Sequence, residues 1–133
     1  MAGIKDIQIL LRNMEPVLDR TDYVFYSTGS SKLTAEIVIM NPVVTILEDE
    51  GMTVVVSKKQ ADAYKLPFSI VFHKISLNIH SSLEAVGLTA AISTALASHN
   101  ISANVVAGYY HDHIYIPKDS ADLALEILEG LRH

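Results

Sequence analysis

The clearest pattern in the chain is an alternation of apolar and polar positions over residues 71–80. A period of two predicts a β-strand with one buried face. One histidine falls on the apolar side, which predicts that its ring is buried or lies at an interface. The odd, mainly apolar positions are Val71, His73, Ile75, Leu77 and Ile79.

A helix is predicted directly after this strand. Ser81 and Glu84 have the spacing of a capping box, a pair that opens a helix. Apolar residues then recur at steps of four over 88–96, and the pattern continues to about residue 99. Asn100 fits the C-terminal end of the helix, since asparagine tolerates a left-handed backbone.

Two more strands and a helix complete the C-terminal pattern. The β-rich runs 101–107 and 111–116 are predicted strands joined by a turn. A last helix follows Asp119 or Ser120. The order of residues 67–133 is therefore β-α-β-β-α, one strand short of a ferredoxin-like βαββαβ unit. We expect the N-terminal half to supply the missing strand.

The N-terminal half shows shorter and less regular patterns. Residues 4–14 have helical spacing, and the runs 23–26 and 52–56 are typical of strands. The run 43–47 fits either a strand or a short helix. Residues 58–65 predict one or two helical turns.

Composition and charge narrow the function classes. The chain has 133 residues, half of them apolar, which suits a globular protein. It has no cysteine, which excludes disulfides, thiolate metal sites and cysteine nucleophiles. The net charge of −5 and ten scattered basic residues argue against a nucleic-acid partner. No run approaches the roughly 20 apolar residues of a membrane helix, and no signal peptide is evident, so we expect a cytoplasmic protein without membrane partners.

Two strings in the C-terminal half are distinctive. They are HSSLEAVGLTAA at 80–91 and ISANVVAGYYHDH at 101–113. Both strings resemble the bacterial ACT-domain proteins of the DUF2241 (ACT_3) group. Shorter upstream pieces fit the same group, namely Met14-x-Pro16-x-Leu18, Tyr23-Val24-Phe25 and Glu48-x-Glu50-Gly51-x-Thr53.

The resemblance implies an α+β protein of two ferredoxin-like ACT halves in tandem, with antiparallel sheets. With a boundary at Leu66-Pro67, the halves are residues 1–66 and 67–133. Such paired ACT units are similar to the regulatory domains of aspartate kinases. ACT domains bind amino acids at the loop after their first strand, often between two domains. The resemblance therefore implies a non-catalytic regulatory protein that binds a small molecule, most simply an amino acid, needs no cofactor and forms a homodimer.

The residues after the strand that ends near residue 80 also suggest that this loop is the ligand-binding site. Free backbone N–H groups at the start of the helix predicted after Ser81 favour an anion such as a carboxylate. Gly87 allows a close approach, and Asn104 offers both a donor and an acceptor. Asp112 and the acidic turn 48–50 are candidates to hold the ammonium group of a ligand. Helix capping alone also explains the presence of Ser81 and Glu84, without a ligand. The predicted ligand-binding residues are His80, Ser81, Ser82, Glu84, Val86, Gly87, Leu88, Asn104 and Asp112.

The string 109–113 leaves an alternative open. His111 and His113 are predicted to share one side of a strand and, with His80 and Asp112, suggest a metal-binding protein or an enzyme. A hydrogen-bonded hairpin end explains the string more simply, and we assign no metal and no catalytic residue. No P-loop, G-x-S-x-G or G-x-G-x-x-G motif occurs. A third possibility is an interaction scaffold with no ligand.

Overall fold

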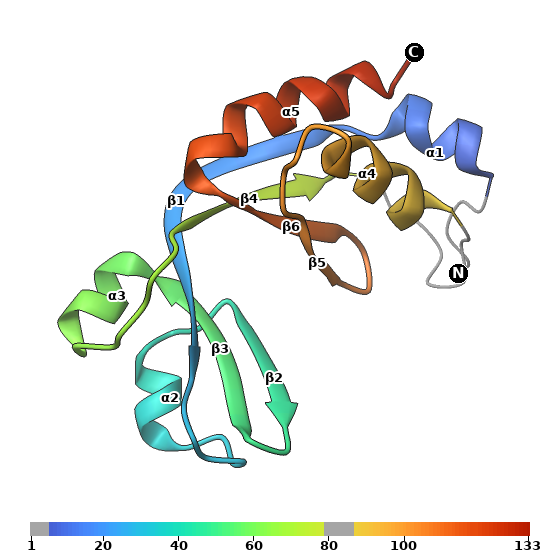
Figure 1. Ribbon diagram of the computed structural model, residues 1–133. Helices are drawn as coiled ribbons and strands as arrows, with labels where there is room; N and C mark the ends of the chain where they lie inside the picture. The colour runs from blue at the N-terminus through green and yellow to red at the C-terminus, as the bar shows by residue number, and fades with distance from the viewer. Residues whose placement is uncertain (1–5, 79–86) are drawn as a thin grey trace. The chain divides into compact units, whose positions relative to one another are not determined.

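A computed structural model describes residues 6–78 and 87–133 of the chain (Figure 1). The chain divides into two compact units. The middle unit comprises Thr21–Phe72, and the terminal unit combines Met1–Arg20 with His73–His133. Each unit has a hydrophobic core of its own. In the described residues, no helix is long and apolar enough to cross a membrane.

The middle unit is a three-stranded antiparallel sheet with two short helices. Its elements are the second part of β1 (Pro16–Ser27), α2 (Ala35–Ile39), β2 (Val44–Glu48), β3 (Gly51–Ser57) and α3 (Lys58–Ala63). The strand order is β2-β3-β1. Both helices pack on one face of the sheet, and the core between them is formed by Val24, Ile37, Met40, Met52, Val54, Val56 and Ala61.

Strand pairing decides the ambiguous run 43–47. Val44 lies opposite Val55, and the register continues to Glu48 opposite Gly51. The run is therefore strand β2, and the acidic residues after it form the predicted tight turn into β3. Backbone hydrogen bonds to the next strand, β3, hold β2, so the period of its own side chains could not identify it.

The terminal unit has a four-stranded sheet in the order β1-β4-β6-β5. The first residues of β1 supply the strand that residues 67–133 lack, as the sequence predicted. The predicted alternation is also confirmed over Phe72–Leu77, because β4 is alternately half-buried and buried there, while residues 79 and 80 of the predicted strand lie outside the described residues. The remaining elements are α1 (Ile7–Asn13), β4 (Phe72–Leu77), α4 (Leu88–Ala97), β5 (Asn104–Ala107), β6 (Asp112–Pro117), a 3-10 turn (Lys118–Ser120) and α5 (Ala121–Gly130).

One face of this sheet carries the core of the terminal unit. Apolar residues of α1, α4 and α5 pack there against β4 and β6, with Leu10, Ile75, Leu96 and Ile114 fully buried. His73 is buried, as predicted. Both units thus have the β-α-β-β-α order of a ferredoxin-like α+β fold.

The start of α4 corrects the sequence analysis. The pattern predicted a helix through Gly87, but α4 begins at Leu88, with Gly87 as its N-cap in a left-handed conformation (φ 102°). A residue with a side chain would be strained there. The nearest described atoms that a Cβ would meet belong to Ile7, at 3.9 Å, so backbone conformation explains this glycine and crowding by described residues does not.

Candidate ligand-binding site

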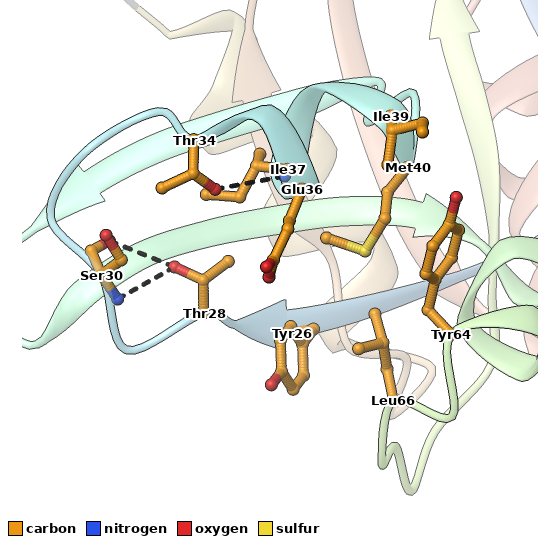
Figure 2. A pocket seen from close by; sticks show the side chains of 10 residues that line it. All are labelled: Tyr26, Thr28, Ser30, Thr34, Glu36, Ile37, Ile39, Met40, Tyr64 and Leu66. Carbon is orange, nitrogen blue, oxygen red and sulfur yellow. Dashed lines mark hydrogen bonds between the residues drawn. The ribbon is translucent and has the colours of Figure 1, made fainter.

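A cavity of about 410 Å³ lies in the middle unit (Figure 2). Cavities of this size hold small molecules. Its walls come from the end of β1, the loop between β1 and α2, α2 itself, and the segment that follows α3. The lining residues are Tyr26, Thr28, Ser30, Thr34, Glu36, Ile37, Ile39, Met40, Tyr64 and Leu66.

The loop between β1 and α2 is fixed by hydrogen bonds to β3. The Thr28 N–H donates to the Met52 carbonyl (2.9 Å), and the Met52 N–H donates to the Ser30 carbonyl (2.7 Å). The Thr28 hydroxyl also accepts from the Ser30 N–H at 3.2 Å. Gly51 lies directly against this loop, because a Cβ built on it would come within 2.8 Å of the Gly29 backbone. The loop therefore presents its hydroxyl groups from a defined backbone.

A side-chain cap fixes the start of helix α2. Thr34 is the N-cap, and its Oγ1 accepts from the Ile37 N–H at 3.3 Å. This start buries Ile37 in the core. Glu36 and Met40, four residues apart on one helix face, point from α2 toward the cavity in Figure 2.

The segment after α3 closes the cavity on another side. Lys65 has a left-handed backbone (φ 56°), and the Leu66 N–H donates to the Ala61 carbonyl at 2.8 Å. This is the hydrogen-bond pattern of a Schellman-type helix end. The turn sets Tyr64 and Leu66 against the cavity, on the side away from Ser30 (Figure 2).

The predicted site residues lie in the second half of the chain. His80, Ser81, Ser82, Glu84 and Val86 fall outside the described residues. Gly87 caps α4, and Leu88 is buried in the core of the terminal unit. The Asn104 side chain donates to the Tyr115 carbonyl at 3.1 Å, across the β5–β6 hairpin. Asp112 starts β6, and burial raises the pKa of its carboxyl group, although His113 and His111 oppose this. Their role in ligand binding stays a prediction.

The string 109–113 forms the end of the β5–β6 hairpin. The Gly108 N–H donates to the His111 carbonyl at 2.9 Å, and the Tyr109 and Tyr110 rings pack edge to face. His113 Nδ1 is hydrogen-bonded to the Ser76 hydroxyl at 2.7 Å. Within residues 6–78 and 87–133, no three His, Asp or Glu side chains come together to hold a metal.

His113 is expected to make stability fall on acidification. Burial and the nearby Lys74 and His111 lower its pKa, and Asp112 only partly offsets them. The unfolded chain then binds the extra proton more readily, so this contribution is complete above the unfolded pKa, about 6.5, and is lost below it. In thermal unfolding between about pH 7.5 and 5.5, a His113→Gln variant should lose less stability than the wild type.

His99 provides the matched control, because it is an exposed histidine on the same unit. A His99→Gln variant, titrated alongside, measures the effect of removing a histidine from the surface of this unit. The raised pKa of Asp112 acts in the opposite direction, since its contribution is complete below the unfolded carboxyl pKa and is lost as pH rises. That window begins at the unfolded carboxyl pKa, about 3.9, and extends upward from there, so Asp112 can only reduce the fall in stability that His113 causes on acidification. Equal pH dependence of His113→Gln and wild type would contradict the assignment.

Comparison with known proteins identifies the fold family. Two family models, both described as ACT domain, match residues 2–73 and residues 70–130. The chain belongs to the ACT-domain family. The tandem arrangement of two ACT domains is therefore confirmed, and the exact division at Leu66-Pro67 stays a prediction.

Solved structures agree with this assignment. A protein of unknown function from Vibrio cholerae, described as a possible transport protein, is 43% identical, covers 99% of this chain and 100% of its own, and has a TM-score of 0.86. A protein from Agrobacterium tumefaciens has a TM-score of 0.71 at 11% identity, covering 91% and 90%. The ligand-free regulatory subunit of aspartate kinase from Thermus thermophilus has 0.63 at 14%, covering 87% and 95%. No curated protein matches.

The cavity gives a second candidate site that the sequence analysis missed. It lies at the loop after the first strand of the first ACT domain, whereas the predicted site lies at the corresponding loop of the second. The turn Thr28-Gly29-Ser30-Ser31, directly after a β-rich run, was the available signal. The capping box at Ser81 drew attention to the second loop only.

Proposed function

We propose that this ACT-domain protein is a non-catalytic regulatory protein that binds a small molecule of amino-acid size in the cavity of its middle unit. The observation that carries the proposal is the position of this cavity at the loop after the first strand of an ACT domain. Its walls combine apolar side chains with hydroxyl groups and one carboxylate, as small-molecule sites usually do. Amino acids and their close derivatives are the first compounds to test.

Regulation would follow from differential binding. The cavity is lined by segments that are separate in sequence, the loop after β1, α2 and the turn after α3. A ligand that contacts all three favours the arrangement in which they close on it, and so shifts the population toward that arrangement. The regulatory subunit of aspartate kinase from Thermus thermophilus, which is similar in fold, supports this kind of role. The homodimer and the cytoplasmic location stay predictions.

A thermal-shift screen against the proteinogenic amino acids and their decarboxylated or deaminated derivatives tests the proposal. A ligand at one hundred times its dissociation constant stabilises the folded state by about 2.7 kcal/mol, a shift of several degrees. Tyr64→Ala removes one wall of the cavity and should abolish the shift. Tyr110→Ala removes an exposed tyrosine outside the cavity and should keep the shift. A flat result at millimolar concentration, or equal shifts in Tyr64→Ala and wild type, would contradict the proposal.

A further inference from the structure

The formal charge among the residues that line the cavity is negative only. Of the ten described residues that line it, Glu36 carries a formal charge and the others are neutral. No lysine or arginine is among these lining residues. A carboxylate on the ligand would therefore find hydroxyl groups but no cation, and would lie near a negative charge.

Glu36 is available to a ligand. Its carboxylate points from α2 into the space above Thr28 and Tyr26 (Figure 2). Within the described part of the chain it forms no ion pair and no hydrogen bond. A helix dipole favours an acidic residue in the first turn, where Glu36 lies. The dipole of the five-residue helix α2 is small, so it accounts only in part for a glutamate at this position. An ammonium group would supply the missing partner.

The remaining walls suit the body of an amine. Met40, Ile37 and Leu66 give an apolar surface, and Tyr26 and Tyr64 add aromatic rings. The faces of such rings attract cations, so they reinforce the preference that Glu36 sets. The hydroxyls of Tyr26 and Tyr64 form no hydrogen bond within the described residues.

We infer that the cavity selects a primary amine with an apolar body, recognised by its ammonium group at Glu36, over a free amino acid or a carboxylic acid. This inference rests on the proposed function and narrows it to one ligand class. A free amino acid carries the same ammonium group but also a carboxylate, which this cavity does not balance with a positive charge. A carboxylic acid lacks the group that Glu36 binds.

Two matched trios of ligands test the inference by isothermal titration calorimetry on the full chain. One trio is isoamylamine, leucine and isocaproate, and the other is phenethylamine, phenylalanine and hydrocinnamate. Within each trio the amine should bind at least about tenfold more tightly than the amino acid, because a charge-assisted hydrogen bond is retained and an unbalanced carboxylate is avoided. The acid should show no binding.

Variants of Glu36 make the test specific. Glu36→Gln keeps the shape of the side chain and should weaken amine binding about tenfold or more. Glu36→Lys reverses the charge and should shift the preference toward the acid. Glu126→Gln removes an exposed carboxylate on α5 of the terminal unit, outside the cavity, and should bind amines as the wild type does.

The outcomes separate this inference from the proposed function. If amino acids bind better than amines, and Tyr64→Ala abolishes that binding, the amine preference is wrong while ligand binding in the cavity stands. Equal amine binding by Glu36→Gln and wild type also overturns the inference. If no member of either trio binds to the wild type at millimolar concentration, the amine inference fails, and a flat amino-acid screen then removes the proposed function as well.

Discussion

A Gly51→Ala variant is expected to lose about 3 kcal/mol or more of unfolding free energy, through backbone strain and a clash that nothing nearby can relieve. Gly51 is buried at the start of β3, with φ at +137°, a region that residues with side chains rarely adopt. The added Cβ would lie 2.8 Å from both the Cα and the N of Gly29. Both of these are backbone atoms, so no side chain can rotate away.

The clash would also disturb the candidate site. Gly29 lies between Thr28 and Ser30, two lining residues whose backbones are hydrogen-bonded to Met52. Moving Gly29 away from Gly51 stretches these bonds and displaces the loop. We therefore expect Gly51→Ala to lose ligand binding even at temperatures at which it is still folded.

Gly29→Ala is the control for this variant. Gly29 also has a positive φ, +73°, but a Cβ built there meets no described atom within 4 Å. Its replacement should carry the conformational strain alone, about 1 to 2 kcal/mol. Urea unfolding of both variants and the wild type measures the difference. A loss for Gly51→Ala no larger than that for Gly29→Ala would show that the contact between the two glycines is not tight.

The sequence predicted the parts of the fold in which burial follows a local period. The alternation that ends at Leu77 and the four-residue steps from Leu88 to Leu96 both correspond to buried faces. Asn100, predicted to end the helix, has the left-handed backbone expected of such a residue (φ 58°). Side-chain period and residue type were sufficient at these positions because each element packs one face on a core.

Features set by distant contacts were not predictable in this way. Gly51 directly follows the acidic turn 48–50, and nothing in the local pattern indicated its close contact with Gly29, 22 positions earlier in the sequence. The predicted helix ran through Gly87 because spacing does not reveal the positive φ of this residue, which a continuous helix does not allow. A close contact between two backbones and a positive φ are properties of the folded backbone, and the pattern of side chains does not reveal them.

The candidate site shows the same limit. Glu36 and Tyr64 line one cavity only because α2 and α3 pack on the same face of the sheet. Neither residue belongs to a motif. The resemblance to ACT domains pointed to the loop after a first strand, and with two such domains there are two loops. Local capping signals favoured the loop at Ser81, whereas the described cavity lies at Thr28.

A Leu96→Ala variant is expected to destabilise the protein by about 2 to 5 kcal/mol, the usual range for removing a leucine from a close-packed core. Leu96 is fully buried in the core of the terminal unit, in the same cluster as Ile92 and Leu128. Its carbonyl accepts from the Ile101 N–H at 3.0 Å, and the substitution leaves this backbone bond in place. The loss therefore reports side-chain packing.

Leu123→Ala is the matched control, because Leu123 lies on α5 of the same unit and its side chain is 45% exposed. Both substitutions replace leucine by alanine within a ten-residue helix, so they remove the same atoms and change helix propensity by the same amount. The difference between their effects therefore comes from burial. We expect Leu123→Ala to lose less than about 1 kcal/mol in the same urea titration. Equal losses in the two variants would mean that α4 does not pack on the sheet through Leu96, and the arrangement of this core would have to be revised.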